Sequence, residues 1–449
     1  MPTITRFAPS PTGKLHLGGA RTALFNYLHA RSNDGTFKIR IEDTDKSRNI
    51  TQTSNEILES LNWLGFKIDG PMVFQSKNIK NHLEVADSLI SNGLAYKCFH
   101  DDSYITEKKM SKQKFISEWR DGKKQKSNKP YVIRIKAPLN GNYTLKDEVQ
   151  GKIVVNFNEL DDYIIVRTDK TPTFLLSSVV DDVEMKISDI IRGDDHLTNT
   201  FRQKIIFDFL NYKPNFAHIS LLHNDQNQKM SKRDNSISVL DYKKKGYLPE
   251  ALNNYLLRLG WSHGDQEFFS LQEAVKLFSL SNLGKSPAKL DEKKLNFLNS
   301  HYLRQLSNTQ IYKQLEPLST QSIVNDRKIM ELIDLYKERS ISLEDIGKNL
   351  FNIIDYNHKF EDNEKKILKE FEEYKSLFIK NFTNIKKWDD SNIELFFKDF
   401  IDLHGLSFKS IAQPIRLLIT GNIKGPSVYS IIRVLGKTEC LKRIMQNFK

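Results

Sequence analysis

The sequence predicts an α/β fold with a parallel sheet, interrupted by a β-containing insert and followed by an all-α region. Three observations support this prediction: strand and helix patterns alternate near the amino terminus, they alternate again after about residue 179, and helical patterns prevail after about residue 301. A chain of 449 residues has room for about three domains. We expect a split α/β domain of residues 1–80 and 179–235, an insert of 81–178, a region of 236–309 and a helical region of 310–449.

The amino-terminal stretch reads as a strand, a helix and a strand. TITRF is a short alternating segment, and ARTALFNYLHAR repeats apolar residues at helical spacing. In FKIRIED, apolar and charged residues alternate, so that Glu42 shares one strand face with Lys38 and Arg40. This order predicts a βαβ unit with parallel strands.

From about residue 72 to 178 the pattern is irregular. A polar, lysine-rich segment, ITEKKMSKQKFISEWRDGKKQKSNKP, precedes three strand-like segments, YVIRIK, KIVVNF and YIIVRT. The parallel pattern resumes in DIIRGDDH, which runs from a strand into a turn, and in the amphipathic helix TNTFRQKIIFDFLN. Pro249 then opens the helix EALNNYLLRLG, at a position where a first helical turn tolerates proline.

Composition excludes several classes of protein. With 39% hydrophobic and 28% charged residues the chain is neither disordered nor fibrous, and no run approaches eighteen apolar residues. The start MPTITRFAPS lacks the zones of a secretory signal, which predicts a cytoplasmic protein. Cys98 and Cys440 are the only cysteines, so a disulfide framework is excluded. The net charge of +12 favours a polyanionic partner such as nucleic acid, although a solvated lysine-rich surface gives the same count.

A histidine and two glycines follow the first strand directly. The strand runs into PSPTGKLHLGG, whose last four residues include His16, Gly18 and Gly19. The start of a helix attracts anions, because its unpaired N–H groups and its dipole point toward them. Glycine lets a phosphate or an adenine ring approach the backbone, and an imidazole can donate a hydrogen bond to a phosphoryl oxygen. The turn is therefore a candidate nucleotide site, although a glycine pair at such a turn also serves packing alone.

A cationic segment, KMSKR at residues 229–233, follows the second α/β unit. Taken alone, three cations in five residues are typical of a solvated surface loop. Together with H-x-G-G after the first strand, they form the signature pair of class I aminoacyl-tRNA synthetases, which this chain resembles.

Longer matches resemble bacterial glutamyl-tRNA synthetases in particular. They are RFAPSPTGKLHLGGARTALFNYLHAR, FKIRIEDTD, VVDDVEMKISDIIRGDDHLTNTFRQ, KMSKRD and GYLPEALNNYLLRLGWSHGDQE. The resemblance is strong to about residue 300, thins beyond it, and returns in AQPIRLLITG and SIIRVLGK. The glutaminyl relative has P-E-P-N-G and H-I-G-H where this chain has P-S-P-T-G and H-L-G-G, and the short paralogue that modifies queuosine lacks the helical region.

The resemblance implies a Rossmann-type catalytic domain that activates L-glutamate with ATP and Mg²⁺ and transfers it to the terminal adenosine of tRNA. In-line attack on the α-phosphate needs no covalent enzyme nucleophile, so positioning and charge do most of the catalysis. The resemblance implies that the catalytic residues are His16, Lys229 and Lys232, and that these bind ATP together with Gly18, Gly19, Asp195 and Ser231. For Asp195, a role in capping the following helix is the alternative.

Glutamate needs cations for its γ-carboxylate and an anion for its α-ammonium group. Arg6 ends the first strand and Arg192 ends DIIRGDD, at the carboxyl ends of parallel strands, where open α/β sheets bind ligands. Arginine suits carboxylate recognition, and Glu42 is placed to meet the ammonium group. The resemblance adds Ala8 and Ser10 as contacts. Singly, each charged residue fits an ordinary ion pair as well.

The chain departs from the family at a substrate-contacting position. A tyrosine normally follows P-T there, whereas this chain has Phe174. A lost hydroxyl forfeits about 1.5–3 kcal/mol if no other donor replaces it. Ser178, at a variable substrate-contacting position, is the candidate for a substitute donor.

A second departure concerns zinc, which many members bind in the insert. Cys98 and His100 are present in YKCFH, but no second ligand pair follows in WRDGKKQKSNKPYVIRIK. A structural zinc site normally has four ligands, so we predict no zinc and no other protein-bound metal.

The predicted partner is tRNA. KSPAKLDEKKLNFLNSHYL resembles the segment that contacts the tRNA stem, the insert would face the acceptor end, and the helices after about residue 310 would reach the anticodon. In this interpretation the basic helical half supplies phosphate contacts. A monomer is the family default.

Three alternatives stay open. One is a paralogue that charges the glutamine tRNA with glutamate, which the catalytic motifs do not distinguish. Another is a nucleotidyl-transfer enzyme that acts without tRNA, since the H-x-G-G fold also hosts such enzymes. The third is a non-catalytic tRNA-binding relative, against which both intact signature motifs argue.

Overall fold

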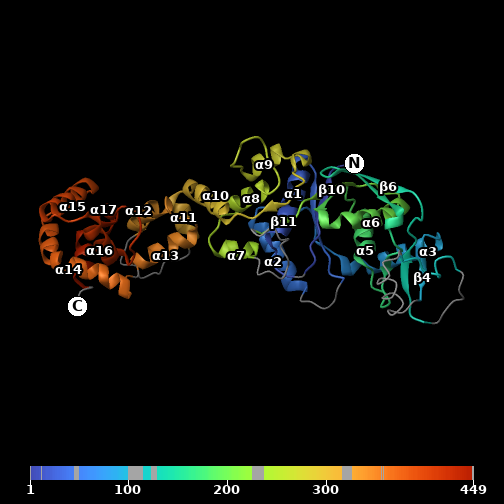
Figure 1. Cartoon of the computed structure of the whole chain (residues 1–449), viewed down its shortest axis with the longest axis horizontal. Coiled ribbons are helices and arrows are strands. Elements are labelled where there is room, and N and C mark those ends of the chain that lie inside the picture. The colour runs from blue at the N-terminus through green and yellow to red at the C-terminus, as the bar shows by residue number, and fades with distance from the viewer. Residues whose placement is uncertain are drawn as a thin grey trace. The chain divides into compact units, whose positions relative to one another are not determined.

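The computed structural model describes residues 2–11, 13–44, 50–99, 115–122, 129–224, 237–315, 326–354, 356 and 358–446. The chain divides into two compact units, Met1–Leu240 with Asn253–Asp291, and Asp241–Leu252 with Glu292–Lys449 (Figure 1). The division falls within helices α7 (Val239–Lys244) and α8 (Pro249–Arg258).

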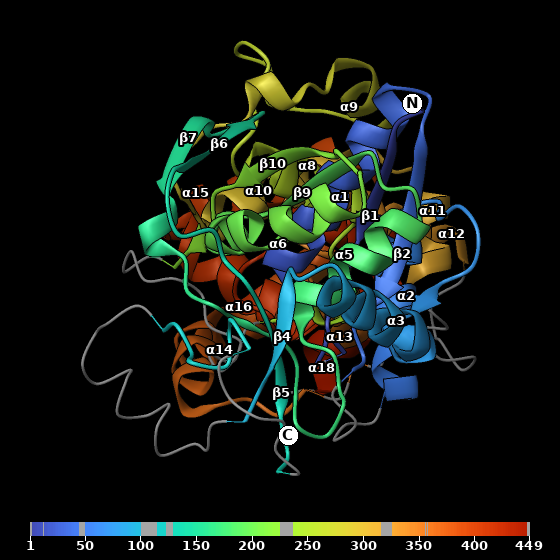
Figure 2. The same ribbon diagram turned by 90° about the vertical axis from the view of Figure 1, so that its right-hand side faces the viewer.

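Parallel strands form the centre of the first unit (Figure 2). Strand β1 (Ile4–Phe7) pairs with β2 (Thr36–Ile41) and β2 with β3 (Val73–Phe74), while β10 (Asn215–Ile219) pairs with both β9 (Asp189–Gly193) and β6 (Asn142–Asp147). Next to β9, the N–H of Ser188 donates to the carbonyl oxygen of Ile4 in β1 at 3.0 Å. Two sheets, β3-β2-β1 and β9-β10-β6-β7 with β7 at Gly151–Asn156, therefore lie edge to edge where β1 contacts β9, and the predicted α/β class is confirmed.

The remaining elements of the first unit connect or flank these strands. Its helices are α1 (Leu17–Ser32), α2 (Ile50–Trp63), α3 (Ile79–Ser91), α5 (Phe174–Glu184), α6 (Leu197–Phe209) and α9 (Leu271–Leu277). Its other strands are β4 (Ala95–Cys98), β5 (Val132–Ile135), β7 (Gly151–Asn156), β8 (Ile164–Val166), β11 (Leu222–His223) and β12 (Ala288–Lys289).

The strands expected in the insert form, but they belong to two sheets. YVIRIK and YIIVRT contain β5 and β8, which pair antiparallel with each other in a small sheet that also holds β4. KIVVNF contains β7, which forms a hairpin with β6, and this hairpin joins the parallel strands through β10. Residues of the expected insert therefore reach the same sheet as β9.

Both faces of strand β2 are buried. The apolar side chains of Phe37 and Ile39 are fully buried, and so is Arg40 on the charged face. Beside it, the Nζ atom of Lys38 donates to the carbonyl oxygen of Met185, which ends α5, at 3.0 Å. The reason is that helices cover both faces of a parallel sheet. Charged residues on this strand face the helix layer rather than solvent.

The part of the second unit that the structure describes is helical, as the sequence predicts. Its helices are α10 (Glu292–Gln305), α11 (Asn308–Gln314), α12 (Asp326–Lys337), α13 (Leu343–Ile354), α14 (Asp362–Thr383), α15 (Asp390–His404), α16 (Phe408–Thr420), α17 (Val428–Leu435) and α18 (Lys437–Gln446). Helices α15 and α16 end at Gly405 and Gly421, whose φ angles of 63° and 70° are left-handed. Glycine adopts this conformation without a steric cost, so both helices stop there.

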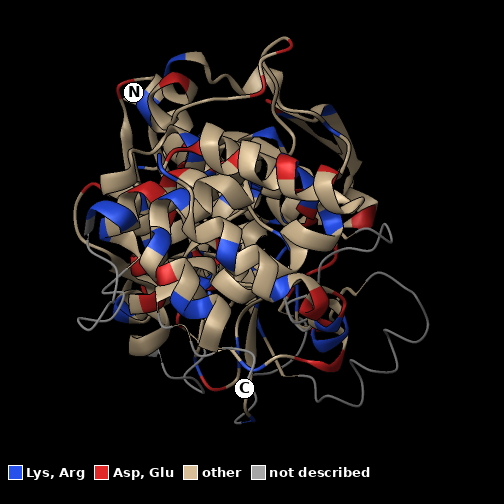
Figure 3. Cartoon of the chain, turned by 90° about the vertical axis from the view of Figure 1, so that its left-hand side faces the viewer, with Lys and Arg blue, Asp and Glu red and all other residues tan. Residues whose placement is uncertain are grey.

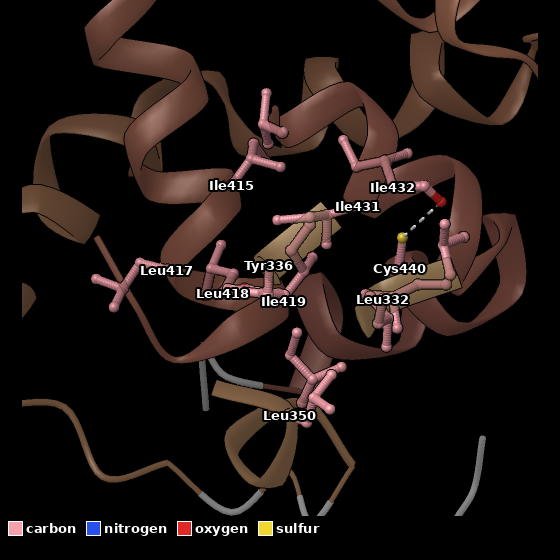
Figure 4. Close-up of a cluster of buried hydrophobic side chains, with 14 of the residues drawn as sticks. Leu332, Tyr336, Leu350, Ile415, Leu417, Leu418, Ile419, Ile431, Ile432 and Cys440 are labelled. Carbon is pink, nitrogen blue, oxygen red and sulfur yellow. Dashed lines mark hydrogen bonds between the residues drawn. The ribbon is translucent and has the colours of Figure 1, made fainter. Parts of the chain in front are cut away.

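The core of the second unit is built from the apolar stripes of several helices (Figure 4). Leu332 and Tyr336 of α12, Ile415 of α16 and Ile431 of α17 meet there with Cys440 of α18. Burial raises the pKa of the Cys440 thiol to about 12, so this cysteine stays protonated at neutral pH and packs as an apolar residue.

Positive charge is not concentrated in the helical half, contrary to the expectation above. Residues 301–449 contain 24 Lys and Arg against 20 Asp and Glu, whereas residues 1–300 contain 44 against 36. Figure 3 shows both signs interspersed over the helices. Within residues 301–449, the clearest excess lies in residues 408–446, which comprise α16 to α18 and contain seven Lys and Arg and one Glu.

Candidate active site

His16 caps the helix that begins at the H-x-G-G turn. Its backbone is extended, helix α1 starts at the next residue, and its Nδ1 atom accepts the N–H of Gly19 at 3.2 Å. Because Nδ1 accepts, the proton of the neutral ring lies on Nε2, which makes that atom a donor. Helix α1 has no acidic residue in its first turn. The turn is therefore suited to an anion.

Described residues that follow the cationic segment contact the H-x-G-G turn. Lys229, Ser231 and Lys232 fall outside the described residues, but the chain that follows them returns to the H-x-G-G turn. Ser238 forms a β-bridge with His16, and the N–H of Val239 donates to the carbonyl oxygen of Leu15 at 2.9 Å. The chain at Ser238 and Val239, a few residues after the cationic segment, is thus anchored beside the candidate nucleotide site.

Arg6 and Glu42 are held in one buried cluster of charges. The Nε atom of Arg6 donates to Asp182 Oδ1 at 2.9 Å, and Arg40 donates both to Asp182 and, at 3.2 Å, to Glu42. Burial alone would raise the pKa of Asp182, but Arg40 and Arg6 outweigh it and the pKa falls. Burial raises the pKa of Glu42, and Arg40 and Arg6 offset only part of that rise. Asp182 therefore orients both the Arg6 side chain and, through Arg40, Glu42.

Arg192 lies in strand β9 with neutral partners only. Its Nη2 atom donates to Thr200 Oγ1 at 2.6 Å and to Gln203 Oε1 at 2.8 Å, and its Nε atom donates to His218 Nε2 at 3.3 Å. Only 7% of the residue is exposed, and among the described residues no carboxylate forms an ion pair with it. Burial, followed by the nearby positive charge of Arg6, lowers the pKa of Arg192 to about 9. A buried guanidinium without a carboxylate partner is costly, which indicates a site for an anionic ligand.

Phe174 begins helix α5 with its ring against His196, at a centroid distance of 5.3 Å. Burial, followed by the charge of Arg192, lowers the pKa of His196 to about 4, so this imidazole is neutral at pH 7. The proposed substitute donor is committed elsewhere: Ser178 Oγ donates to the carbonyl oxygen of Phe174 at 2.6 Å and accepts from Gln203 at 2.6 Å. Ser178 therefore supports Gln203 and has no proton left for a ligand.

Asp195 folds back on the end of strand β9. A Cβ atom added to Gly193 would lie 2.6 Å from Asp195 Oδ1, so any other residue at position 193 would displace that carboxylate. His196 stands at the N-cap position of α6 without a side-chain hydrogen bond, and Asp195 precedes it in the short 3₁₀ helix Asp194–His196, so the role of Asp195 stays a prediction. Ala8 and Ser10 follow β1, where the N–H of Glu42 donates to the carbonyl oxygen of Pro9 at 3.0 Å.

Comparisons with known proteins agree with this arrangement. Residues 3–297 match the family of tRNA synthetases class I (E and Q), catalytic domain, and residues 310–447 match an anticodon binding domain. The chain belongs to this class I synthetase family. Its membership in that family, together with the strand order, confirms the Rossmann-type interpretation and the resemblance on which it rests.

Relatives align with nearly the whole synthetase chain. A glutamate–tRNA ligase of Ehrlichia chaffeensis is 42% identical over 98% of this chain and 97% of its own, and one of Pelagibacter ubique is 41% identical over 98% of each. The crystal structure of a glutamate tRNA ligase from Elizabethkingia meningosepticum in complex with its amino acid has a TM-score of 0.85 and 29% identity, and covers 99% of both chains.

Several residues of the synthetase site escaped sequence analysis. Arg40 could have been found, because it shares the charged strand face with Glu42. Asp182 also carries a signal, since two aspartates stand inside the apolar run of VVDDV. His218 and Gln203 carry none, because they reach Arg192 from other elements and no local pattern marks them.

No cluster of three or more His, Cys, Asp or Glu that could hold a metal occurs in the part of the chain that the structure describes. Cys98 is buried with its sulfur 3.7 Å from Ser117 Oγ, and His100 falls outside the described residues. The absence of zinc stays a prediction. Among the described helices, none is long and apolar enough to cross a membrane.

Proposed function

We propose that this synthetase is a glutamate–tRNA ligase. It joins L-glutamate and ATP into glutamyl adenylate with release of pyrophosphate, and then transfers the glutamyl group to the terminal adenosine of tRNA. The observation that carries the substrate assignment is Arg192, a buried cation whose described partners are all neutral, next to Arg6 and Glu42 at the carboxyl ends of neighbouring parallel strands. The names of the full-length relatives support the same activity.

In this proposal each charge of glutamate has a partner. The γ-carboxylate binds Arg192 and Arg6, and the α-ammonium group binds Glu42. The segment of Ala8 and Ser10 contributes backbone and hydroxyl contacts, and Phe174 lines the pocket. The substrate carboxylate then supplies the negative charge that Arg192 lacks, so part of the cost of burying that arginine is recovered only when glutamate is bound.

ATP is a substrate, and Mg²⁺ accompanies it as the counter-ion of its phosphates. The α1 amino terminus with Gly18 and Gly19 receives the phosphates, and the Nε2 donor of His16 contacts a phosphoryl oxygen. Lys229, Ser231 and Lys232 bind the nucleotide, with the two lysines at the leaving pyrophosphate. Asp195 contacts the ribose. The negative charge that develops during in-line displacement is thus stabilised by the α1 amino terminus with His16 and by the two lysines.

The tRNA contacts extend over the rest of the chain. We assign residues 81–178 to the acceptor end, 236–309 to the stem and 310–449 to the anticodon region, around a catalytic domain of 1–80 and 179–235. The charge distribution refines this assignment, because α16 to α18 hold the basic excess of the helical unit and expose Lys409, Lys424 and Lys442. We further propose a monomeric cytoplasmic enzyme without zinc.

The decisive test is charging with labelled glutamate on two purified transcripts, the glutamate and glutamine tRNAs. Charging of the glutamate tRNA alone would establish a discriminating enzyme. Charging of both, or of the glutamine tRNA alone, would support the paralogue that serves the indirect route to glutaminyl-tRNA. Charging of neither, with ATP and Mg²⁺ present, would overturn the proposal and favour a tRNA-free nucleotidyl transferase or a non-catalytic relative.

The nucleotide site has its own test. His16→Ala and Lys232→Ala should each lower charging by roughly 100-fold or more, since removal of one such donor costs about 3 kcal/mol of transition-state stabilisation. Lys80→Ala is the matched control, because among the described residues this exposed lysine pairs only with Glu84 on the same helix. Rates close to wild type in both site variants would refute the assignment.

A further inference from the structure

Three neighbouring strands carry a buried chain of polar side chains that ends at Arg192. Asp147 is the last residue of β6, His218 lies in β10 and Arg192 in β9, and these strands are adjacent in the sheet. Asp147 Oδ2 lies 2.6 Å from His218 Nδ1, and the side chains of both residues are fully buried. The opposite ring nitrogen, Nε2, lies 3.3 Å from Arg192 Nε.

The partners of Asp147 fix its protonation state. Its Oδ1 atom accepts the backbone N–H groups of Val149 at 3.0 Å and Gln150 at 2.8 Å, and the N–H of His218 approaches both oxygens. Burial would raise the pKa of Asp147, but the hydrogen bonds from His218 and Gln150 outweigh burial and lower it. Asp147 is therefore a carboxylate that only accepts, and His218 Nδ1 must carry a proton.

The tautomer of His218 follows from Arg192. A guanidinium has donors only, so the Nε2 atom that faces Arg192 Nε must present its lone pair. Thr200 is compatible with the same direction: its Oγ1 atom accepts from Arg192 Nη2 at 2.6 Å and lies 2.9 Å from His218 Nε2, and its proton can share the Nε2 lone pair with Arg192 or go to the carbonyl oxygen of His196 at 3.4 Å. Burial, which lowers the pKa of His218, keeps the ring neutral in agreement with this pattern.

The orientation of Gln203 is fixed in the same way. Its Nε2 atom donates to Ser178 Oγ at 2.6 Å, so its Oε1 atom faces Arg192 Nη2 at 2.8 Å. Three of the five N–H groups of Arg192 are therefore satisfied by His218, Thr200 and Gln203. The two on Nη1 have no hydrogen-bond partner among the described residues.

We propose that Asp147 and His218 are positioning residues that hold Arg192 so that its Nη1 end meets the substrate carboxylate. This inference rests on the proposed function, because it needs glutamate as the ligand. Asp147 sets the imidazole tautomer, the imidazole fixes the plane of the guanidinium, and no partner in contact with Arg192 neutralises its charge. Arg192 then binds the carboxylate through one nitrogen, rather than through the side-on fork that its Nε and Nη2 atoms would form.

Asp147→Asn tests the tautomer directly. The amide oxygen can keep the backbone N–H groups, but the amide nitrogen now donates to His218 Nδ1, which moves the ring proton to Nε2 and points it at a donor of Arg192. We expect the KM for glutamate to rise at least 10-fold, with the KM for ATP and the kcat at saturating glutamate within about 3-fold of wild type. An unchanged KM for glutamate would overturn the proposal.

A pair of substitutions at His218 separates positioning from packing. His218→Asn keeps a donor toward Asp147 and loses the acceptor toward Arg192, whereas His218→Gln can place an amide oxygen near the position of Nε2. His218→Asn should raise the KM for glutamate as Asp147→Asn does. His218→Gln should have a KM for glutamate closer to that of the wild type. Equal behaviour of both would argue against the proposal. His29→Asn is the matched control, since His29 contacts Asp189 of the same strand β9 at 3.5 Å.

Nitrogen NMR of histidine-labelled full-length protein gives a readout that does not depend on charging. The signal that disappears in His218→Gln identifies His218, and we expect it to show the Nδ1-protonated tautomer in the wild type and the Nε2-protonated tautomer in Asp147→Asn. An Nε2-protonated ring in the wild type would refute the relay even if charging is normal. A wild type that charges no tRNA with glutamate would instead refute the proposed function, whatever the tautomer.

Discussion

Replacement of Arg192 by methionine should separate stability from function. Arg192 is buried, and its described hydrogen-bond partners are neutral, so no carboxylate in contact with it offsets the cost of its charge, and the more distant Asp182 and Glu42 offset only part of it. A pKa that falls from 12.5 to about 9 corresponds to roughly 5 kcal/mol for the charged form at neutral pH, at 1.36 kcal/mol per pKa unit. Arg192→Met removes this cost.

The same substitution also removes three hydrogen bonds, which limits the gain. Thr200 and His218 retain their mutual hydrogen bond at 2.9 Å, whereas Gln203 Oε1 loses its partner, at a cost of about 1–3 kcal/mol. Methionine is also shorter than arginine and leaves a small void. We therefore expect Arg192→Met to be as stable as the wild type or up to about 3 kcal/mol more stable.

The activity of Arg192→Met with glutamate should fall, even though its stability does not. Loss of the charge-assisted contacts to the γ-carboxylate should lower kcat/KM for glutamate by about 100-fold, which is about 3 kcal/mol. Calorimetric unfolding with and without glutamate measures both effects, because a ligand at 100 times its Kd stabilises the folded state by about 2.7 kcal/mol. Glutamate should raise the unfolding temperature of the wild type and leave that of Arg192→Met unchanged. A variant that is destabilised by more than about 3 kcal/mol and still charges normally would refute this reasoning.

Three further predictions concern the same unit. Asp182→Asn should lower the free energy of unfolding by about 3–5 kcal/mol in calorimetry, because it leaves two buried arginines without their shared carboxylate. Gly193→Ala should raise the KM for ATP several-fold by displacing Asp195, while Gly284→Ala, whose new Cβ would meet its nearest neighbour at 3.7 Å, should leave it unchanged. The pKa of His196 is about 4 in the folded chain and near 6.5 when unfolded, so the unfolded state binds more protons between these values. Stability should fall by up to about 3 kcal/mol as the pH drops from 6.5 to 4, and His196→Asn should flatten that part of a pH–stability curve.

The elements of the fold were predictable where a single period dominates. FKIRIED, DIIRGDDH and TNTFRQKIIFDFLN each have the spacing of the element they form, and the structure contains all three. The sequence predicts KIVVNF, which contains β7, as a strand of the insert, but nothing in that segment marks its neighbour β6 or the pairing of β6 with β10. Strand pairing depends on contacts between segments that are distant along the chain, and a period of two carries no information about them.

The site was predictable to the extent that its residues stand at strand ends or in motifs. Arg6, Glu42 and Arg192 could be chosen from position and chemistry. In the structure Arg6 is held by Asp182, and Glu42 is held by Arg40. The residues that orient them were not predictable. They act through hydrogen bonds between elements far apart in sequence, and an isolated buried histidine or glutamine looks the same whether it supports a site or fills a core.

Arg40 and Arg192 show how an arginine that stabilises the fold differs from one that binds a substrate. Arg40 is surrounded by Asp182, Glu42 and Asp181, and although burial opposes its charge, these anions outweigh burial and raise its pKa. Arg192 is also buried, but burial and then the nearby charge of Arg6 lower its pKa, since the neighbours that accept its hydrogen bonds are neutral and do not match its charge. An arginine that only held the fold together would be more stable with a carboxylate beside it, and the three carboxylates of this cluster lie beside Arg40 instead. The charge left unmatched at Arg192 is the property that a pocket for a substrate carboxylate requires, since an internal partner would compete with the ligand for the same nitrogen.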